Sequence, residues 1–406
     1  MTSLYKQKIG GKSVFLIVIA FFTVALTSWE DAINAPGYAA IYEEFASASA
    51  FLKGYIVTGP NLFALPFILL TGKLANRFSK KDIILVANIF YTIGGIGGAF
   101  SKSLLWFAVC RTIVGVAIGV ETTAIMGLLF ELFPRSEDSA KVMGAYQGVN
   151  TIYGALVAVI AGQLCTINWR VAQLLNGLSI ISMLAILFFL PRTPPEKGTQ
   201  KQEDAYAVDR PEKLMVGQLL LALFETVSFI IFSFLFYYFS SLYLAERQLG
   251  TSVFSGWLSS IMLIGASSMN FLLGVVHSRL KRYTGVISVG ILAIGFILIG
   301  SDIPAWVLIP YAFVNGAVCG IIGSYYPIAV NACVPASMTT QYQSIYSCVI
   351  FAAYYFASYV PNLYQGLFHV GYHKMMLVNG IVLTCLAVMY GLLITITNRS
   401  RKTVQP

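Results

Sequence analysis

The stretch Thr71–Lys81 reads TGKLANRFSKK and lies between two long apolar runs, at about residues 54–71 and 83–100. Four of its eleven residues are Lys or Arg. Basic residues in a short loop between two membrane spans mark the cytoplasmic side of the bilayer. The stretch therefore predicts two membrane-spanning helices that are joined by a cytoplasmic loop.

The composition extends this prediction to the whole chain. Of 406 residues, 57% are hydrophobic and 11% are charged, with a mean hydropathy of +0.76. A soluble domain has about 25% charged residues, and a spanning helix needs ~20 apolar residues. Twelve such runs predict an all-α membrane protein. They lie at about 13–35, 49–71, 83–101, 104–130, 142–165, 171–191, 215–244, 253–276, 284–301, 304–332, 340–367 and 374–397.

The net charge of +9 reflects topology, because the basic residues sit in short loops. Most of the 26 Lys and Arg residues fall on one predicted side. The exceptions in loops on the other side are Lys53, Lys102, Arg170, Arg247 and Lys374. We therefore expect a protein of the cell membrane with both termini in the cytoplasm, and no nucleic-acid partner.

The two halves of the chain repeat. Three pairs of residues each differ by 202 in residue number, namely Gly54 and Gly256, Gly72 and Gly274, and Arg77 and Arg279. A Gly-x-x-x-Gly pattern at residues 115–119 recurs at 316–320. With six spans per half, both halves have the same orientation. The predicted domains are an N-terminal bundle at 1–191, a cytoplasmic linker at 192–214 and a C-terminal bundle at 215–406.

The opening stretch resembles a loop of a known family. It is similar to Gly-x-x-x-Asp-Arg-x-Gly-Arg/Lys-Arg/Lys, which joins the second and third helices of the major facilitator superfamily. Gly72 and Arg77 match, whereas Asn76 and Ser79 replace the acidic residue and the second Gly. The resemblance implies two six-helix bundles in a parallel pseudo-repeat, with the substrate site between them. It also implies gating roles for Gly72, Arg77 and, through the repeat, Arg279.

Other segments resemble the same family. The fourth span carries Arg-x-x-x-Gly at residues 111–115, and residues 134–144 resemble the loop that follows it. The acidic first span resembles that of bacterial drug–proton antiporters, which are the members closest in character. The Gly-Pro pair that those antiporters carry in the fifth helix is absent, because that span has no Pro.

Besides Lys53 and Lys374 near the outer ends of two spans, five charged residues fall within predicted spans: Glu30, Asp31, Arg111, Glu121 and Glu225. A charge in the bilayer costs about 2.5–3.5 kcal/mol on insertion scales, so each is a candidate functional residue. At ~1.5 Å per residue, Glu30 and Arg111 lie at matching depth. We predict that Arg111 pairs with Glu30 or Asp31. Consecutive residues are ~100° apart around a helix. We therefore predict that only one of these two acidic side chains faces Arg111.

The acidic residues are candidates for proton coupling. Glu30 or Asp31 is a candidate proton carrier by the resemblance, although hydration at the outer interface would also explain both. Glu121 and Glu225 come from opposite halves at similar depth, and burial favours the neutral form of a carboxyl group. Either can therefore bind and release a proton, or form only a neutral buried hydrogen bond.

Polar and aromatic residues within spans complete the candidate substrate site. Besides Arg111, the set is Gln147, Asn150, Tyr237, Asn270, Asn315, Tyr346 and Tyr354. Amides can bind polar groups of a substrate, but bonds between helices would explain them as well. Charge in the N-terminal half and rings in the C-terminal half suit an amphipathic or aromatic organic solute.

These patterns predict a secondary transporter of a small amphipathic or aromatic organic solute that works by alternating access, with proton-coupled efflux favoured. Proton-coupled uptake of an organic anion held by Arg111, and a non-transporting sensor, remain alternatives. No metal-ligand spacing or nucleophile–base pair is found in the sequence, so we expect no enzyme, metal or cofactor. The expected partners are the solute, protons and the lipid bilayer, and the chain is predicted to be a monomer.

Overall fold

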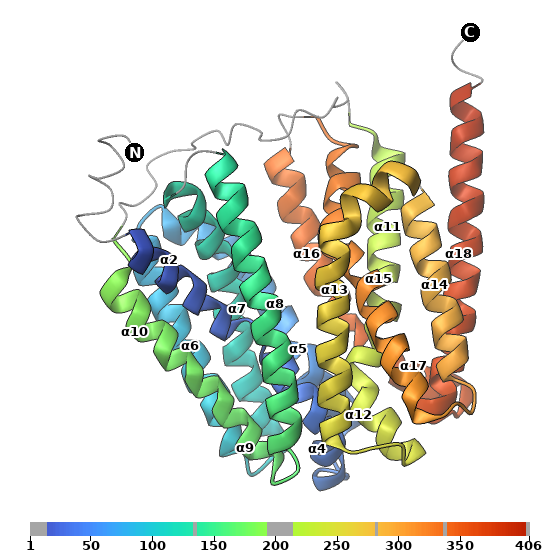
Figure 1. The fold of residues 1–406 in the computed structure, drawn as a ribbon, viewed down its shortest axis with the longest axis horizontal. Coiled ribbons are helices and arrows are strands. Elements are labelled where there is room, and N and C mark those ends of the chain that lie inside the picture. The colour runs from blue at the N-terminus through green and yellow to red at the C-terminus, as the bar shows by residue number, and fades with distance from the viewer. Residues whose placement is uncertain (1–13, 133–135, 193–213, 281–282, 336–338, 403–406) are drawn as a thin grey trace. The chain divides into compact units, whose positions relative to one another are not determined.

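Every secondary-structure element in the described part of the chain is a helix. The computed structural model describes residues 14–132, 136–192, 214–280, 283–335 and 339–402 (Figure 1). The chain divides into two compact units, Met1–Ala207 and Val208–Pro406. The boundary between these units falls within the segment that the sequence assigns to the linker.

The N-terminal unit contains α2 (Val14–Thr23), η1 (Val24–Thr27), α3 (Glu30–Asn34), η2 (Ala35–Gly37), α4 (Tyr38–Glu44), α5 (Ala50–Ala75), α6 (Lys80–Ala99), α7 (Leu104–Leu132), α8 (Ser136–Leu164), α9 (Trp169–Gln173), η3 (Leu174–Leu178) and α10 (Ser179–Phe189). The C-terminal unit contains α11 (Val216–Ser233), α12 (Leu235–Arg247), α13 (Ser252–Leu280), α14 (Thr284–Ile299), η5 (Ala305–Val307), α15 (Leu308–Asn331), α16 (Thr339–Ala357), α17 (Val360–Phe368) and α18 (Tyr372–Lys402).

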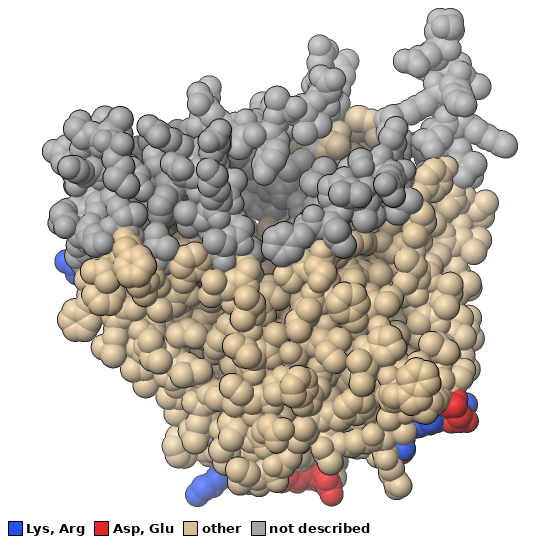
Figure 2. Space-filling view, viewed as in Figure 1, with Lys and Arg blue, Asp and Glu red and all other residues tan. Residues whose placement is uncertain are grey.

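The helices account for the predicted spans in order. Among the described residues, 7 helices are long and apolar enough to cross a membrane, and a bent pair at Phe15–Thr27 and Glu30–Glu44 is an eighth candidate. Four shorter apolar helices lie at Gly148–Leu164, Thr284–Ile299, Ala305–Ile321 and Ile345–Ala357. On the face shown in Figure 2, the described side chains form a broad uncharged band with charges only at its margins. Such a surface fits hydrocarbon.

The first span is broken, unlike the others in its unit. Its two parts meet at an angle of 44°, next to Trp29, whose backbone angles (φ −120°, ψ 37°) are not helical. The helix therefore begins again at Glu30, so Glu30 and Asp31 lie in the first turn of α3. This break determines where the two acidic side chains point.

Glycines fix the second and fourth spans against each other. A Cβ atom on Gly115 or Gly119 of α7 would collide with the backbone of Pro60 or Ala64 of α5. Small residues let helix backbones approach closely in membranes, where there is no hydrophobic force between helices. The Gly-x-x-x-Gly pattern is thus a helix-packing motif, as the sequence indicated.

The C-terminal unit repeats this packing. A Cβ atom on Gly316 or Gly320 of α15 would collide with the backbone of Met262 or Ala266 of α13. Met262 and Ala266 follow Pro60 and Ala64 by 202 residues. The internal repeat read from the sequence therefore recurs as the same contact between corresponding helices within each unit.

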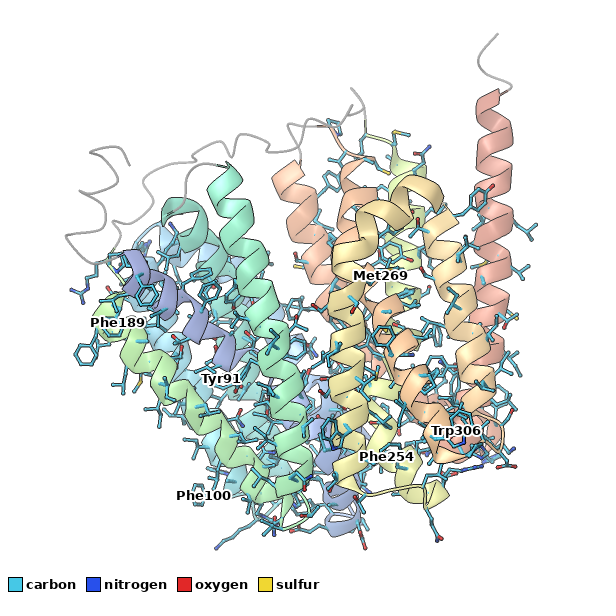
Figure 3. The ribbon with its side chains drawn as sticks, in the orientation of Figure 1. Tyr91, Phe100, Phe189, Phe254, Met269 and Trp306 are labelled. Carbon is cyan, nitrogen blue, oxygen red and sulfur yellow. The ribbon has the colours of Figure 1, made fainter. Side chains whose placement is uncertain are left out.

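Polar bonds join the third and sixth spans inside the N-terminal unit. Tyr91, which is fully buried, donates its hydroxyl to Asn176 at 3.0 Å, and Figure 3 shows it among the helices of this unit. Asn88 donates to the Ser182 hydroxyl at 3.0 Å. Each bond satisfies a polar group that would otherwise be buried in an apolar region.

Replacing a packing glycine tests the close contact between α13 and α15. We expect Gly316→Ala to lower the free energy of unfolding by about 1–3 kcal/mol, because the new methyl group meets backbone that has little room to move. Gly290→Ala in α14 is the matched control, since a Cβ there meets nothing within 4 Å. Melting of the purified protein in detergent measures both, and equal melting temperatures would contradict the contact.

Candidate functional site

Arg111 of α7 is the centre of a buried ion-pair cluster. Its guanidinium forms an ion pair with Glu30 and donates to the Asp31 carboxylate at 2.7 Å. It also donates to the carbonyl oxygens of Ile56 and Val57 in α5, each at 2.8 Å. The exposed fractions of the Arg111 and Glu30 side chains are 1% and 2%. The predicted pairing between the first and fourth spans is confirmed.

The expectation that only one of the two acidic residues faces Arg111 is wrong. It assumed that two side chains ~100° apart around a helix cannot both reach the same partner. In the structure they lie at the start of α3, directly after the break at Trp29. The planar guanidinium has five N–H donors in a wide fork. It therefore contacts both carboxylates from one position.

Pro60 explains why the Ile56 carbonyl of α5 can accept a hydrogen bond from Arg111. Proline has no N–H, so the carbonyl four residues earlier in a helix, that of Ile56, loses its usual donor. The Nε of Arg111 donates to that same oxygen. In the C-terminal unit the corresponding residues are Met262 and Ala312, so this helix pair has neither the proline nor the arginine.

The cluster continues into a hydrogen-bonded chain. Asn34 donates to the Glu30 carboxylate at 2.7 Å, and Gln173 of α9 donates to the Asn34 side chain at 2.8 Å. Asn34 and Gln173 are 0% and 1% exposed. The chain links α7, α3 and α9, and it holds the Glu30 carboxylate away from water. Neither amide was predicted, because side-chain contacts between distant segments leave no periodic signal in the sequence.

The charges in this cluster do not balance. One guanidinium faces two carboxylates, and an uncompensated charge in a membrane protein is costly. One bound proton would make the cluster neutral. The Asp31 side chain is 30% exposed, compared with 2% for Glu30. Asp31 is thus the carboxylate that water and protons can reach.

Glu121 lines a cavity of about 230 Å³ in the N-terminal unit, whose walls are mostly apolar. Its exposed fraction is 4%, and its Oε1 atom has no hydrogen-bond partner among the described residues. The cavity is also lined by Thr27, Ser28, Tyr146 and Asn150. It therefore combines one buried carboxyl group with hydroxyl and amide groups, which can bind the polar groups of a solute.

Trp29 closes one side of this region. Its indole N–H donates to Asn150 at 2.8 Å, and its ring covers Gly154, where a Cβ would come within 2.6 Å of the ring. Asn150 was predicted as a substrate ligand, and the structure brings it together with Glu121. A glycine at 154 is required because the aromatic ring occupies the space of a side chain.

Glu225 of α11 lies in the C-terminal unit and is 8% exposed. Its carboxylate and the Tyr326 hydroxyl both lie close to Gly285, at 3.5 Å and 3.3 Å from the position of a Cβ there. The hydroxyls of Tyr326 and Tyr390 are buried and have no hydrogen-bond partner among the described residues. Tyr326 therefore lies close to a second buried acidic group.

Rings gather around Phe234 in the same unit. Its centroid lies 5.0 Å from that of Tyr354 and 6.1 Å from that of Tyr237. Tyr346 is 3% exposed. Asn315 is fully buried and donates to the Tyr311 hydroxyl at 3.1 Å. Its amide is therefore engaged within the unit.

The remaining predicted residues are only partly described. Gln147 lies in α8, and Asn270 and Arg279 lie in α13, but their side chains are outside the described part of the structure. Gly72 is exposed, with nothing within 4 Å of a Cβ position, and Arg77 is also exposed. Their gating roles stay predictions.

Lys81 has a structural contact that sequence reasoning missed. Its ammonium group donates to the carbonyls of Leu187 and Leu190, at 2.7 Å and 2.8 Å, where α10 ends. A cation there satisfies carbonyl groups that lack helical donors. The basic loop thus ties the third span to the sixth, in addition to marking topology.

A family model described as Major Facilitator Superfamily matches residues 20–360, and the chain belongs to this family. It is 27% identical over 221 residues to an uncharacterized MFS-type transporter, YybF, of Bacillus subtilis (strain 168), covering 50% of this chain and 51% of the relative. It is 26% identical over 152 residues to the arabinose-proton symporter of Escherichia coli (strain K12), covering 36% and 32%. The chain thus spans about half of the length of the first relative and about a third of the second.

Solved structures show the same fold. The nucleoside transporter NupG has a TM-score of 0.73 at 15% identity, covering 93% of this chain and 98% of that chain. The D-xylose-proton symporter has a TM-score of 0.69 at 16% identity, covering 91% and 97%. The family and the predicted all-α fold of twelve spans in two bundles are therefore confirmed. The chain is an integral membrane protein of a transporter family and not an enzyme.

Removing the guanidinium tests its place in the cluster. We expect Arg111→Met to lower the free energy of unfolding by about 3–5 kcal/mol, because it leaves two carboxylates without a cation. Arg170→Met is the control, since Arg170 pairs with Glu44 at a partly exposed site and such pairs contribute about 0.2–1 kcal/mol. Thermal unfolding in nanodiscs measures both.

The double variant Arg111→Met with Glu30→Gln separates charge from packing. If the cluster is held by charge, the double variant is more stable than the sum of the two single effects predicts. Strictly additive effects, or an Arg111→Met loss no larger than that of Arg170→Met, would contradict this account.

Proposed function

We propose that this protein is a proton-coupled secondary transporter of a small amphipathic organic solute, working by alternating access. The observation that carries the proposal is the cavity that Glu121 lines, which combines apolar walls with a few polar side chains. Glu121 is the proposed proton-binding group, and the hydroxyl and amide groups around it are the proposed contacts for polar groups of the solute. The cell membrane is the proposed location, with both termini in the cytoplasm.

Asp31 and Glu225 are proposed as further proton-binding groups. The support for Asp31 is the unbalanced charge of the Arg111 cluster and its 30% exposure. The support for Glu225 is its burial beside tyrosine hydroxyls. A coupling mechanism needs a group whose charge changes at low cost, and a carboxyl near such partners meets this need.

The acidic first span supports export in exchange for protons as the direction of transport. Uptake together with protons is the second candidate, because a relative is named an arabinose-proton symporter and a structural neighbour a D-xylose-proton symporter. Uptake of an organic anion that is bound by Arg111 has less support. The guanidinium is 1% exposed and already contacts two carboxylates and two carbonyl groups.

Proteoliposomes that enclose a pH-sensitive dye test the function. Arabinose, xylose, a nucleoside and an amphipathic aromatic amine would each be added outside vesicles that contain the full chain. Acidification of the lumen on addition of a solute indicates uptake with protons, and alkalinisation indicates exchange against protons. If solutes enter with no pH change in either direction, proton coupling is wrong.

Glu121→Gln tests the proton-binding group. We expect it to abolish solute-driven pH changes while exchange of labelled for unlabelled solute continues, because the cavity keeps its shape but loses its titratable group. Glu44→Gln is the control, since Glu44 is 40% exposed and pairs with Arg170 away from the cavity. Retained coupling in Glu121→Gln would move the role to Asp31 or Glu225, which Asp31→Asn and Glu225→Gln test in the same assay.

A further inference from the structure

An apolar groove of about 550 Å³ lies on the N-terminal unit, apart from the Glu121 cavity. Helices α5 and α6 both pack along α7 but hardly touch each other. A gap therefore remains between them, and side chains of α7 such as Ala117 and Val120 form its floor. Phe67 of α5 and Phe90 of α6 belong to its walls.

The lining of the groove suits hydrocarbon. Asp82 is the one charged residue among those that line it. Val86 and Phe90 on its α6 side are 52% and 45% exposed, so the groove opens to the outside of the helices. In an integral membrane protein such a surface meets lipid chains. Its volume lies within the ~300–1,000 Å³ typical of small-ligand sites.

One end of the groove is basic. Leu74 and Phe78 line that end, and the neighbouring residues Lys73 and Arg77 are exposed. Neither cation has an ion pair among the described residues. Asp82 at the same end is bonded to Arg192 at 3.3 Å, so its negative charge is already compensated. Two positive charges therefore remain beside the apolar surface.

We propose that the groove binds one acyl chain of an anionic phospholipid, whose phosphate group lies against Lys73 and Arg77. An apolar groove with two exposed basic residues at one end matches the two parts of such a lipid. Basic residues next to a span attract anionic lipids by electrostatics. A purely apolar occupant would make no contact with the charges of Lys73 and Arg77.

Native mass spectrometry of the full chain in detergent tests the proposal. Phosphatidylglycerol and phosphatidylcholine with identical acyl chains are added separately, and bound lipid is counted. We expect phosphatidylglycerol to be retained preferentially. Lys73→Ala should weaken its binding about fivefold, as expected for one basic residue near a lipid surface. Phosphatidylcholine binding should not change in that variant.

Val86→Trp tests the groove itself, because the larger side chain fills it. We expect this variant to lose both lipids at the site. Ile93→Trp is the matched control, since Ile93 is 58% exposed on the same helix and does not line the groove. Lys102→Ala is the control for charge, because Lys102 is exposed beyond the other end of α6. Melting curves confirm that each variant is folded.

Asp82→Asn should affect phosphatidylglycerol binding in the opposite direction to Lys73→Ala. It removes a negative charge and frees Arg192, so phosphatidylglycerol binding should become tighter. Three outcomes would overturn the proposal: equal retention of the two lipids, a Val86→Trp variant that behaves like Ile93→Trp, or chain dimers that disappear with Val86→Trp. The last would identify a second copy of the chain as the occupant.

Discussion

A guanidinium cannot be buried among apolar helices unless its donors are satisfied, and the N-terminal unit is arranged around this constraint. Arg111 contacts Glu30, Asp31 and two carbonyls of α5. One of those carbonyls is available because Pro60 cannot donate to it. A proline that would weaken α5 and an arginine that would be costly in α7 thus satisfy each other. This contact therefore joins α3, α5 and α7.

The two units share a packing frame but differ in their polar interiors. Glycines of α7 and α15 press on the backbones of α5 and α13 in the same way. Where the first unit has Arg111, the second has Ala312, which is also fully buried. The buried acidic group of the second unit, Glu225, lies near tyrosines and has no ion pair with a cation among the described residues. The repeat therefore preserves the contacts between helix backbones, whereas the side chains that carry chemistry have diverged.

Hydropathy and glycine spacing were sufficient to predict the spans and the repeat, since both depend on local composition. Depth along the helices was sufficient to pair Arg111 with the acidic first span. The sequence did not reveal the break at Trp29, because no Pro or Gly marks it, and so it wrongly allowed only one acidic partner. Bonds between distant segments, such as those of Gln173 and Lys81, depend on the packed fold and were missed.

These features divide the N-terminal unit into a rigid part and a part that can rearrange. The backbones of α5 and α7 lie in close contact, because Gly115 and Gly119 leave no side chain between them. The first span, by contrast, consists of short helical pieces joined at Trp29. Under the proposed coupling, a proton on Asp31 weakens its attraction to Arg111 while Glu30 retains its own. The change would then act on the first span, because Asp31 lies in α3 directly after the break at Trp29.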